Sequence, residues 1–187
     1  RLQNDLQIHF VDAKNNTSKL IYQEKSNTYV EVIGSWVFLN KTNQMIVTSE
    51  QDGFNHLYAI PYAGGEANQL TKGEWDVTDF YGVNTKGTSL YFQSAEVSPT
   101  QRHIYRLSIK SKKKTQLSKK EGWNEAQFSL GMNFYINTHS DANTPYYISI
   151  HSGTGKELKV LKDNSRLNST LTNYAISQKT FMEIPTS

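Results

Sequence analysis

Short apolar runs separated by polar turns dominate this chain. Within most runs apolar and polar side chains alternate, which is the pattern of a β-strand with one buried face. Residues 44–49 and 55–60 are two such runs, and Asp52-Gly53 between them is a tight-turn signal. The pattern therefore predicts antiparallel strands joined by short turns.

The strand runs return as a unit three times. Each unit holds an apolar strand, a turn, a second strand centred on Tyr, another turn and a strand that ends in Leu. A period of about 45 residues with four strand-like runs per repeat is typical of β-propeller blades. Blades bury their faces against neighbouring blades, so we expect these units to belong to a larger assembly. The units are Met45–Leu70, Leu90–Leu117 and Phe134–Leu161, with Tyr58, Tyr105 and Tyr147 in the shared slot.

The repeat phase predicts an all-β partial propeller with about three full four-stranded antiparallel blades and incomplete terminal blades. Residues 1–34 are expected to form the outer strands of a truncated blade, followed by blades over 35–75, 76–123 and 124–162. The expected strands of the full blades are 35–39, 44–49, 55–60 and 67–71; 77–81, 89–93, 103–109 and 115–118; and 125–130, 134–138, 146–150 and 157–161.

The last segment, 163–187, changes character. Asp163, Asn164 and Ser165 can cap a helix, and Leu167 and Leu171 follow at helical spacing. We expect one short helix near residues 164–173. Residues 179–184 then return to a strand pattern, which predicts a closing strand.

Composition supports exposed antiparallel sheets. The 187 residues are 36% hydrophobic with a mean hydropathy of −0.63, yet 12% are aromatic, including 11 Tyr. Such a mix suits sheets whose aromatic residues fill the layers between them, and it does not suit disorder. With no Cys, disulfides and thiol chemistry are excluded. No apolar run approaches the ~20 residues of a membrane span.

The chain opens at Arg1 inside a strand pattern, and no signal peptide is visible. We interpret it as a segment of a longer protein, so the missing signal says nothing about the location of that protein.

The charge balance gives no reason to expect a nucleic-acid partner. The net charge is +3, and the one dense basic run, Lys110–Lys114, falls between two expected strands. No aromatic residues interleave with these lysines as a stacking platform for bases would need. The run is interpreted as a solvated hairpin tip, with an anion-binding patch as the alternative.

No catalytic, cofactor or metal site is predicted. The nucleophile-elbow pattern G-x-S-x-G does not occur, and Gly153-Thr154-Gly155 falls in an expected turn. Gly64-Gly65 lacks the Lys and the helix of a phosphate-binding loop. His139 and Asp141 form a close His–carboxylate pair, which alone is weak evidence for a metal. Substrate-binding residues are not assigned.

Histidines and large aromatics recur at repeat positions. His9, His56 and His103 lie in or beside strand slots, and repeat position explains the last two without ligand chemistry. Trp75 and Trp123 occupy equivalent crossings from an outer strand to the next inner strand, and Tyr29 holds that slot one blade earlier. We expect these rings to pack between blades, with a ligand-facing role as the alternative.

Two motifs and the tail carry a family resemblance. Thr71–Val77 resembles the blade-crossing motif of the dipeptidyl peptidase IV propeller, and so does Ser49–Tyr58 just before it. The stretch Val160–Leu171 is similar to the closing segment of that domain. The order of the motifs agrees, and the resemblance covers essentially the whole chain.

The resemblance implies an eight-bladed propeller followed by an α/β-hydrolase domain of the prolyl oligopeptidase clan. Such serine enzymes remove N-terminal dipeptides from peptides, usually after Pro or Ala. The nucleophile, acid and histidine belong to the hydrolase domain, and the family's W-x-Y-E-E substrate motif does not occur here. No family site residue is therefore carried over, although residues 29–36 correspond to a region that faces the central cavity in relatives.

The leading hypothesis is a non-catalytic propeller segment that walls the chamber of such an enzyme and limits substrate access. It implies peptide substrates, no cofactor, no membrane insertion by this segment, a bacterial periplasmic or cell-envelope location and a homodimeric parent. The alternative is a stand-alone envelope propeller that acts as a binding or scaffold module. A G-x-S-x-G elbow in the sequence beyond residue 187 distinguishes the two.

Overall fold

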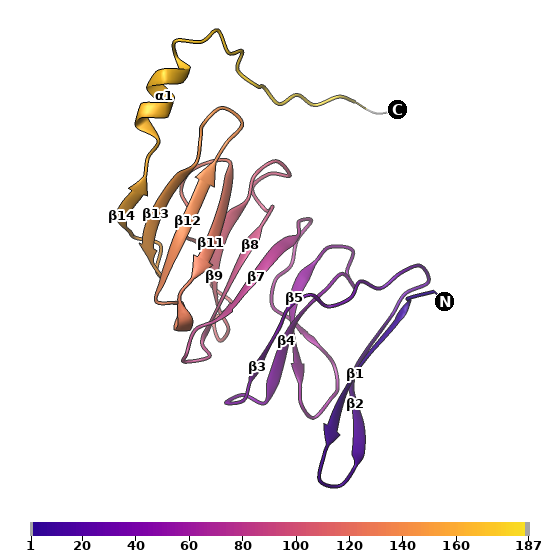
Figure 1. Cartoon of the computed structure of the whole chain (residues 1–187). Coiled ribbons are helices and arrows are strands. Elements are labelled where there is room, and N and C mark those ends of the chain that lie inside the picture. Colours follow the sequence, from indigo (N-terminus) through magenta and orange to yellow (C-terminus); the bar gives the residue numbers. More distant parts are fainter. Residues whose placement is uncertain (1, 186–187) are drawn as a thin grey trace.

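The structure is a computed structural model that describes residues 2–185. Its strands form one two-stranded and three four-stranded antiparallel sheets, which follow one another in chain order (Figure 1). The first sheet is a hairpin of β1 (Asp5–Asp12) and β2 (Thr17–Lys25), with a register shift between Ile8 and His9. This hairpin corresponds to the two outer strands expected for the truncated blade.

Each of the other sheets is a simple meander, and we call them blades one, two and three. Every strand lies within a few residues of its expected range, so the fold class predicted from the repeats is confirmed. Blade one contains β3 (Trp36–Leu39), β4 (Gln44–Ser49), β5 (His56–Pro61) and β6 (Asn68–Gln69); blade two contains β7 (Val77–Val83), β8 (Ser89–Ser94), β9 (His103–Ser108) and β10 (Lys114–Gln116); blade three contains β11 (Trp123–Phe128), β12 (Phe134–Ser140), β13 (Tyr147–Ser152) and β14 (Glu157–Lys162).

Because side chains alternate along a strand, apolar residues are present on both faces of a blade. In β4, Met45 and Val47 point to the β1–β2 hairpin, whereas Ile46 between them points to blade two. Apolar clusters thus fill the space between each pair of neighbouring sheets. One cluster joins the hairpin to blade one, a second joins blades one and two, and a third joins blades two and three. This is the layered packing that a propeller requires.

The first strands of the three blades lie next to one another. β7 contacts both β3 and β11, which places these three strands along one edge of the stack. In a propeller this edge lines the central channel. A 3₁₀ turn, η1 (Leu130–Met132), connects β11 to β12 and also contacts β7.

The C-terminal part contains the expected helix but not the expected strand. α1 (Ser165–Leu171) begins after Asn164, and the Asp163 carboxylate accepts a hydrogen bond from the Ser165 backbone N–H at 3.0 Å. Residues 179–184 form no strand, so that prediction is wrong. A strand needs a neighbouring backbone to pair with, and no strand of the described chain lies alongside this segment. Among residues 2–185, no helix has the length and apolarity of a membrane crossing.

Candidate functional site

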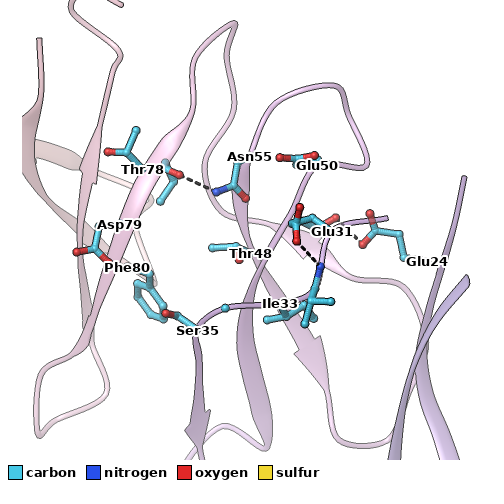
Figure 2. Close-up of a pocket in the computed structure, with 14 residues that line it drawn as sticks. Glu24, Glu31, Ile33, Ser35, Thr48, Glu50, Asn55, Thr78, Asp79 and Phe80 are labelled. Atoms are coloured by element: carbon cyan, nitrogen blue, oxygen red, sulfur yellow. Dashed lines mark hydrogen bonds between the residues drawn. The ribbon is translucent and has the colours of Figure 1, made fainter. Parts of the chain in front are cut away.

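A cleft of about 250 Å³ lies where the hairpin, blade one and blade two meet. Its walls come from β2, from residues 31–35 before β3, from the end of β4 and from the start of β7 (Figure 2). Residues 31–35 belong to the region for which the resemblance implied a cavity-facing position. The lining residues are Glu24, Glu31, Val32, Ile33, Gly34, Ser35, Thr48, Ser49, Glu50, Asn55, Val77, Thr78, Asp79 and Phe80.

Glu24 is held in place on one side of the cleft by two hydroxyl groups. Its carboxylate accepts hydrogen bonds from the Tyr22 hydroxyl and from Ser49 Oγ, both at 2.8 Å. Tyr22 lies on the same strand as Glu24, whereas Ser49 lies on β4, so the carboxylate joins the hairpin to blade one. Burial, followed by the proximity of Glu24, raises the pKa of Tyr22.

Asn55 closes the opposite side by joining blade one to the start of β7. Its backbone N–H donates to Asp76 Oδ1 at 2.8 Å, and its Nδ2 donates to the Val77 carbonyl at 2.6 Å. The Val77 backbone N–H donates in return to the Asn55 carbonyl at 2.7 Å. This reciprocal pairing places Thr78 and Asp79 at the cleft wall (Figure 2).

The cleft is acidic. Four carboxylates line it, and its described lining contains no Lys, Arg or His. Partial desolvation, with a further contribution from Glu125, raises the pKa of Asp79. Glu31 accepts a hydrogen bond from the Val32 backbone N–H at 3.0 Å. An arrangement of this kind favours a cationic group such as an ammonium or a guanidinium.

Most of these residues could not be found from the sequence. Glu24 lies on β2, Glu50 follows the end of β4 and Asp79 lies on β7, and no short motif joins them. Only residues 31–35 carried a signal, through the family resemblance. The cleft is therefore a product of how the sheets pack.

Two of the histidines share one contact in successive blades, from Nδ1 to a hydroxyl group of the crossing that follows. In blade one the Gly73 carbonyl can only accept, so His56 Nε2–H donates to it at 2.9 Å, and Nδ1 accepts from Thr71 Oγ1 at 3.0 Å. Thr71 Oγ1 in turn accepts from the Leu57 backbone N–H at 2.9 Å. Both ring nitrogens are used to hold the third strand of the blade to the crossing that follows it.

Blade two repeats the hydroxyl contact with Ser in place of Thr, but the partner of Nε2 differs. His103 Nδ1 lies 3.0 Å from Ser118 Oγ, which accepts from the Ile104 backbone N–H at 3.0 Å. His103 Nε2 lies 2.9 Å from Gln101 Oε1, an acceptor. Burial is the main cause that lowers the pKa of His103.

The remaining histidines do not assemble a metal site in the described chain. His9 is exposed on the hairpin and lies near Ser18 and Gln7. His139 is 4% exposed and its Nε2–H donates to the Glu121 carbonyl at 2.6 Å, while the Asp141 carboxylate accepts from the Asn143 backbone N–H. Within residues 2–185, no three His, Asp or Glu side chains come together as metal ligands do.

Trp75 packs between blades one and two, as the repeat position predicts. Its ring meets His56 edge-on at 4.8 Å between centroids and lies parallel to Phe92 at 6.5 Å. Lys114 Nζ lies 4.5 Å from the Trp75 ring centroid and forms an ion pair with Glu96. The ring is thus partly buried between side chains of two blades.

The two other aromatic residues of this slot do not pack between blades, so that part of the prediction is wrong. Trp123 is 47% exposed and lies at the surface under the Arg102 guanidinium, 4.9 Å from the ring centroid. Tyr29 is 52% exposed, and its hydroxyl accepts from Gln3 Nε2. Trp75 follows a two-residue strand and turns inward, whereas Trp123 is itself the first residue of β11 and pairs with Ser140.

The lysine run lies around the turn between β9 and β10, as expected. Lys113 is exposed, but Lys112 Nζ crosses to blade one, where it donates to Asn68 Oδ1 and to the Gln69 carbonyl. The two glycine pairs also lie in or beside turns. Gly64 and Gly65 follow β5, and Gly153 and Gly155 belong to the connection between β13 and β14.

Comparisons with known proteins agree with this architecture. Residues 1–146 match the family described as the dipeptidyl peptidase IV (DPP IV) N-terminal region. "Dipeptidyl peptidase 4" of Arthroderma otae is 32% identical over 98% of this chain and 25% of its own length. The chain therefore spans about a quarter of this relative.

Solved structures show the same fold. The crystal structure of Porphyromonas gingivalis dipeptidyl peptidase 4 matches with a TM-score of 0.86 and 37% identity, over 97% of this chain and 26% of that one. A putative dipeptidyl aminopeptidase IV from Bacteroides ovatus matches with a TM-score of 0.72 and 22% identity, over 86% of this chain and 26% of that one, which supports the fold alone. With three stacked blades, matching motifs and a family match over most of its length, the chain belongs to the dipeptidyl peptidase IV N-terminal region family.

Proposed function

We propose that this chain is a non-catalytic propeller segment of a serine-type dipeptidyl peptidase. In this role it walls the active-site chamber and restricts access to thin peptides, while another domain supplies the nucleophile. The whole enzyme releases N-terminal dipeptides that end in Pro or Ala. The observation that carries the proposal is the family match on a chain that folds as stacked blades.

Within this proposal the acidic cleft contacts the cationic part of a peptide substrate. Four carboxylates at one site raise the local concentration of ammonium and guanidinium groups. A peptide carries an ammonium at its N-terminus and on any Lys, and a guanidinium on any Arg. The cleft would therefore bind and orient substrate without taking part in bond breaking.

The first experiment separates the segment from the enzyme. The longer protein should hydrolyse Gly-Pro and Ala-Pro chromogenic substrates, whereas the purified 187-residue chain should not. Turnover by the pure chain, at a rate that scales with its concentration through successive purification steps, would contradict the non-catalytic role. An inactive longer protein without a G-x-S-x-G elbow would favour the stand-alone binding module instead.

The second experiment concerns the cleft. In the longer protein, Glu31→Gln and Glu50→Gln should raise KM for basic peptides several-fold and leave kcat nearly unchanged, because each removes uniform binding. Glu66→Gln is the matched control, since Glu66 is exposed and lies outside the cleft. An unchanged KM in both cleft variants would show that the cleft does not bind substrate.

We further propose that the whole enzyme is a homodimer and that it is located in the bacterial periplasm or cell envelope.

A further inference from the structure

After α1 the chain continues as an exposed tail, residues 172–185, without regular secondary structure (Figure 1). Its apolar side chains are between 62% and 76% exposed, so they bury almost nothing that could hold the tail. The position of the tail must therefore depend on polar contacts. The exposed apolar residues are Tyr174, Ile176, Phe181, Met182 and Ile184.

The polar contacts of the distal tail converge on one side chain, Asn143, in the loop between β12 and β13. Asn143 Nδ2 donates to the Lys179 carbonyl at 3.0 Å, and Asn143 Oδ1 accepts from the Lys179 backbone N–H at 2.8 Å. The carboxamide pairs with both backbone groups of one residue, as a neighbouring strand would. In the described chain these two are the hydrogen bonds made by residues 177–185.

The loop that presents Asn143 is itself ordered by local hydrogen bonds. The Asp141 carboxylate accepts from the Asn143 backbone N–H at 2.7 Å, and the same loop is bonded at its far end by Asn164 Nδ2, which donates to the Tyr146 carbonyl. The loop thus holds the chain at two points, just before α1 and again at Lys179. Between these points, residues 165–178 make no hydrogen bond to blade three.

Open spaces lie on both sides of the tail. One, of about 810 Å³, is lined by the loop together with Leu171 and Tyr174; the other, of about 700 Å³, is lined by the loop together with Trp123 and Phe181. The tail therefore stands beside blade three without packing into it, and the Asn143 contact is not supported by surrounding apolar burial.

From these contacts we propose that Asn143 is a latch that holds the exit of the chain from blade three in one of two states. In the closed state the carboxamide pairs with Lys179. In the open state the pair separates, and the tail moves about residues 173–178. Both hydrogen bonds are exposed and exchange readily for bonds to water, so the closed state is favoured by only about tenfold and the open state stays populated. The inference does not depend on the proposed peptidase activity.

Limited digestion of the 187-residue chain with trypsin tests the latch, because Lys179 is itself a cleavage site. A protease must take the backbone of its target in extended form, and the closed latch occupies the N–H and the C=O of that residue. Cleavage then follows the open population. We expect Asn143→Ala to raise the rate of cleavage after Lys179 on the order of tenfold.

A second variant removes only one of the two hydrogen bonds and should give an intermediate effect. Asn143→Asp keeps the acceptor for the Lys179 N–H but loses the donor to its carbonyl, so its cleavage rate should lie between those of the wild type and Asn143→Ala. Amide hydrogen exchange at Lys179 should give the same order. Asn27→Ala is the control, because that carboxamide is exposed, lies far from the tail and makes no side-chain hydrogen bond among the described residues.

Cleavage after Lys162 and Arg166, just before the tail, reports on the fold in the same digestion. These rates should stay unchanged in every variant. Equal cleavage after Lys179 in the wild type and Asn143→Ala would overturn the proposal. A parallel rise after Lys162 and Arg166 would also overturn it, because the substitution would then have loosened blade three as a whole.

Discussion

At the scale of single residues, polar side chains as well as apolar ones join the strands. His56 and His103 sit at the first position of the third strand in blades one and two, and both bond to a hydroxyl on the crossing that follows. In blade three, Tyr147 occupies this histidine position and not the slot of Tyr58 and Tyr105, to which the repeat assigns it. Its hydroxyl donates to Glu157 instead. The histidines are thus part of the blade architecture.

The buried position of His103 predicts a loss of stability in mild acid. Burial is the largest cause that lowers its pKa; Glu121 opposes the shift and His139 adds to it. An unfolded His titrates near pH 6.5, so below that pH the unfolded chain binds a proton that the folded chain resists. The stabilisation is therefore complete above about pH 6.5 and is lost as the pH falls toward the lower folded pKa.

Urea unfolding at pH 7.5, 6.5 and 5.5 measures this dependence. As the pH falls from 7.5 to 5.5, the free energy of unfolding of the wild type should decrease. That of His103→Gln should be lower than the wild-type value at pH 7.5 but should decrease less over the same range. His9→Gln, on the exposed hairpin, should follow the wild type. If the free energy of unfolding changes equally with pH in the wild type and in His103→Gln, another group causes the pH dependence.

The two tryptophans occupy equivalent positions in the sequence repeat but should contribute different amounts to the stability of the fold. Trp75→Ala removes a ring enclosed by His56, Phe92 and Lys114, so we expect a loss of about 2–4 kcal/mol. Trp123→Ala removes a half-exposed ring and should cost less than about 1 kcal/mol. Chemical denaturation of both variants checks this, and similar losses would contradict the packing described here.

At the scale of elements, close backbone approaches fix how the turns dock. Gly153 begins the connection between β13 and β14, and its N–H donates to the Asn133 carbonyl at 2.7 Å. A Cβ at Gly153 would overlap the Met132 carbonyl oxygen and lie 3.3 Å from the Asn133 oxygen. The turn can therefore press against the η1–β12 connection only if residue 153 has no side chain.

Gly153→Ala should accordingly destabilise the chain by about 1–3 kcal/mol, since backbone atoms must move to admit the methyl group. Gly34→Ala is a matched control, because a Cβ there meets nothing within 4 Å and its backbone needs no left-handed conformation. The thermal midpoint of the control should stay at or above that of the wild type. A Gly153→Ala midpoint equal to the control would show that the turn is more loosely docked.

At the scale of the whole molecule, the stack of sheets has an uncovered face. In β12, Tyr135, Asn137 and His139 are buried on the side of blade two, whereas Phe134 and Ile136 on the opposite side are 52% and 36% exposed. At the other end of the stack, Ile21 of the hairpin is buried and Phe10 packs on blade one. Blade three therefore presents an apolar face that no other described sheet covers.

We expect the isolated chain to self-associate through this face at micromolar concentration, because large apolar patches are uncommon on monomers. Light scattering should show a mass that rises with concentration and returns to the monomer in the double variant Phe134→Thr with Ile136→Thr. Leu130→Ser is the control, since Leu130 is fully exposed in the η1 turn. A wild type that stays monomeric would contradict this prediction and show that the exposed face does not drive association.

Periodicity is read well from sequence because it is local. The alternation in residues 44–49 and the turn at Asp52-Gly53 are set by neighbours in the chain, and both appear in β4 and the turn that follows it. The strand predicted for residues 179–184 has the same local pattern but forms no strand, because pairing requires a partner that the pattern cannot supply.

The sequence by itself determined the strands, the blade repeat and the family, since each depends on spacing along the chain. Only the tertiary structure decided which ring of an equivalent pair is enclosed, as with Trp75 and Trp123. The same holds for the acidic cleft, whose carboxylates come from two strands and two connecting segments, and for the Asn143–Lys179 pair. These features depend on how separate sheets and loops approach in space, and no local spacing encodes that distance.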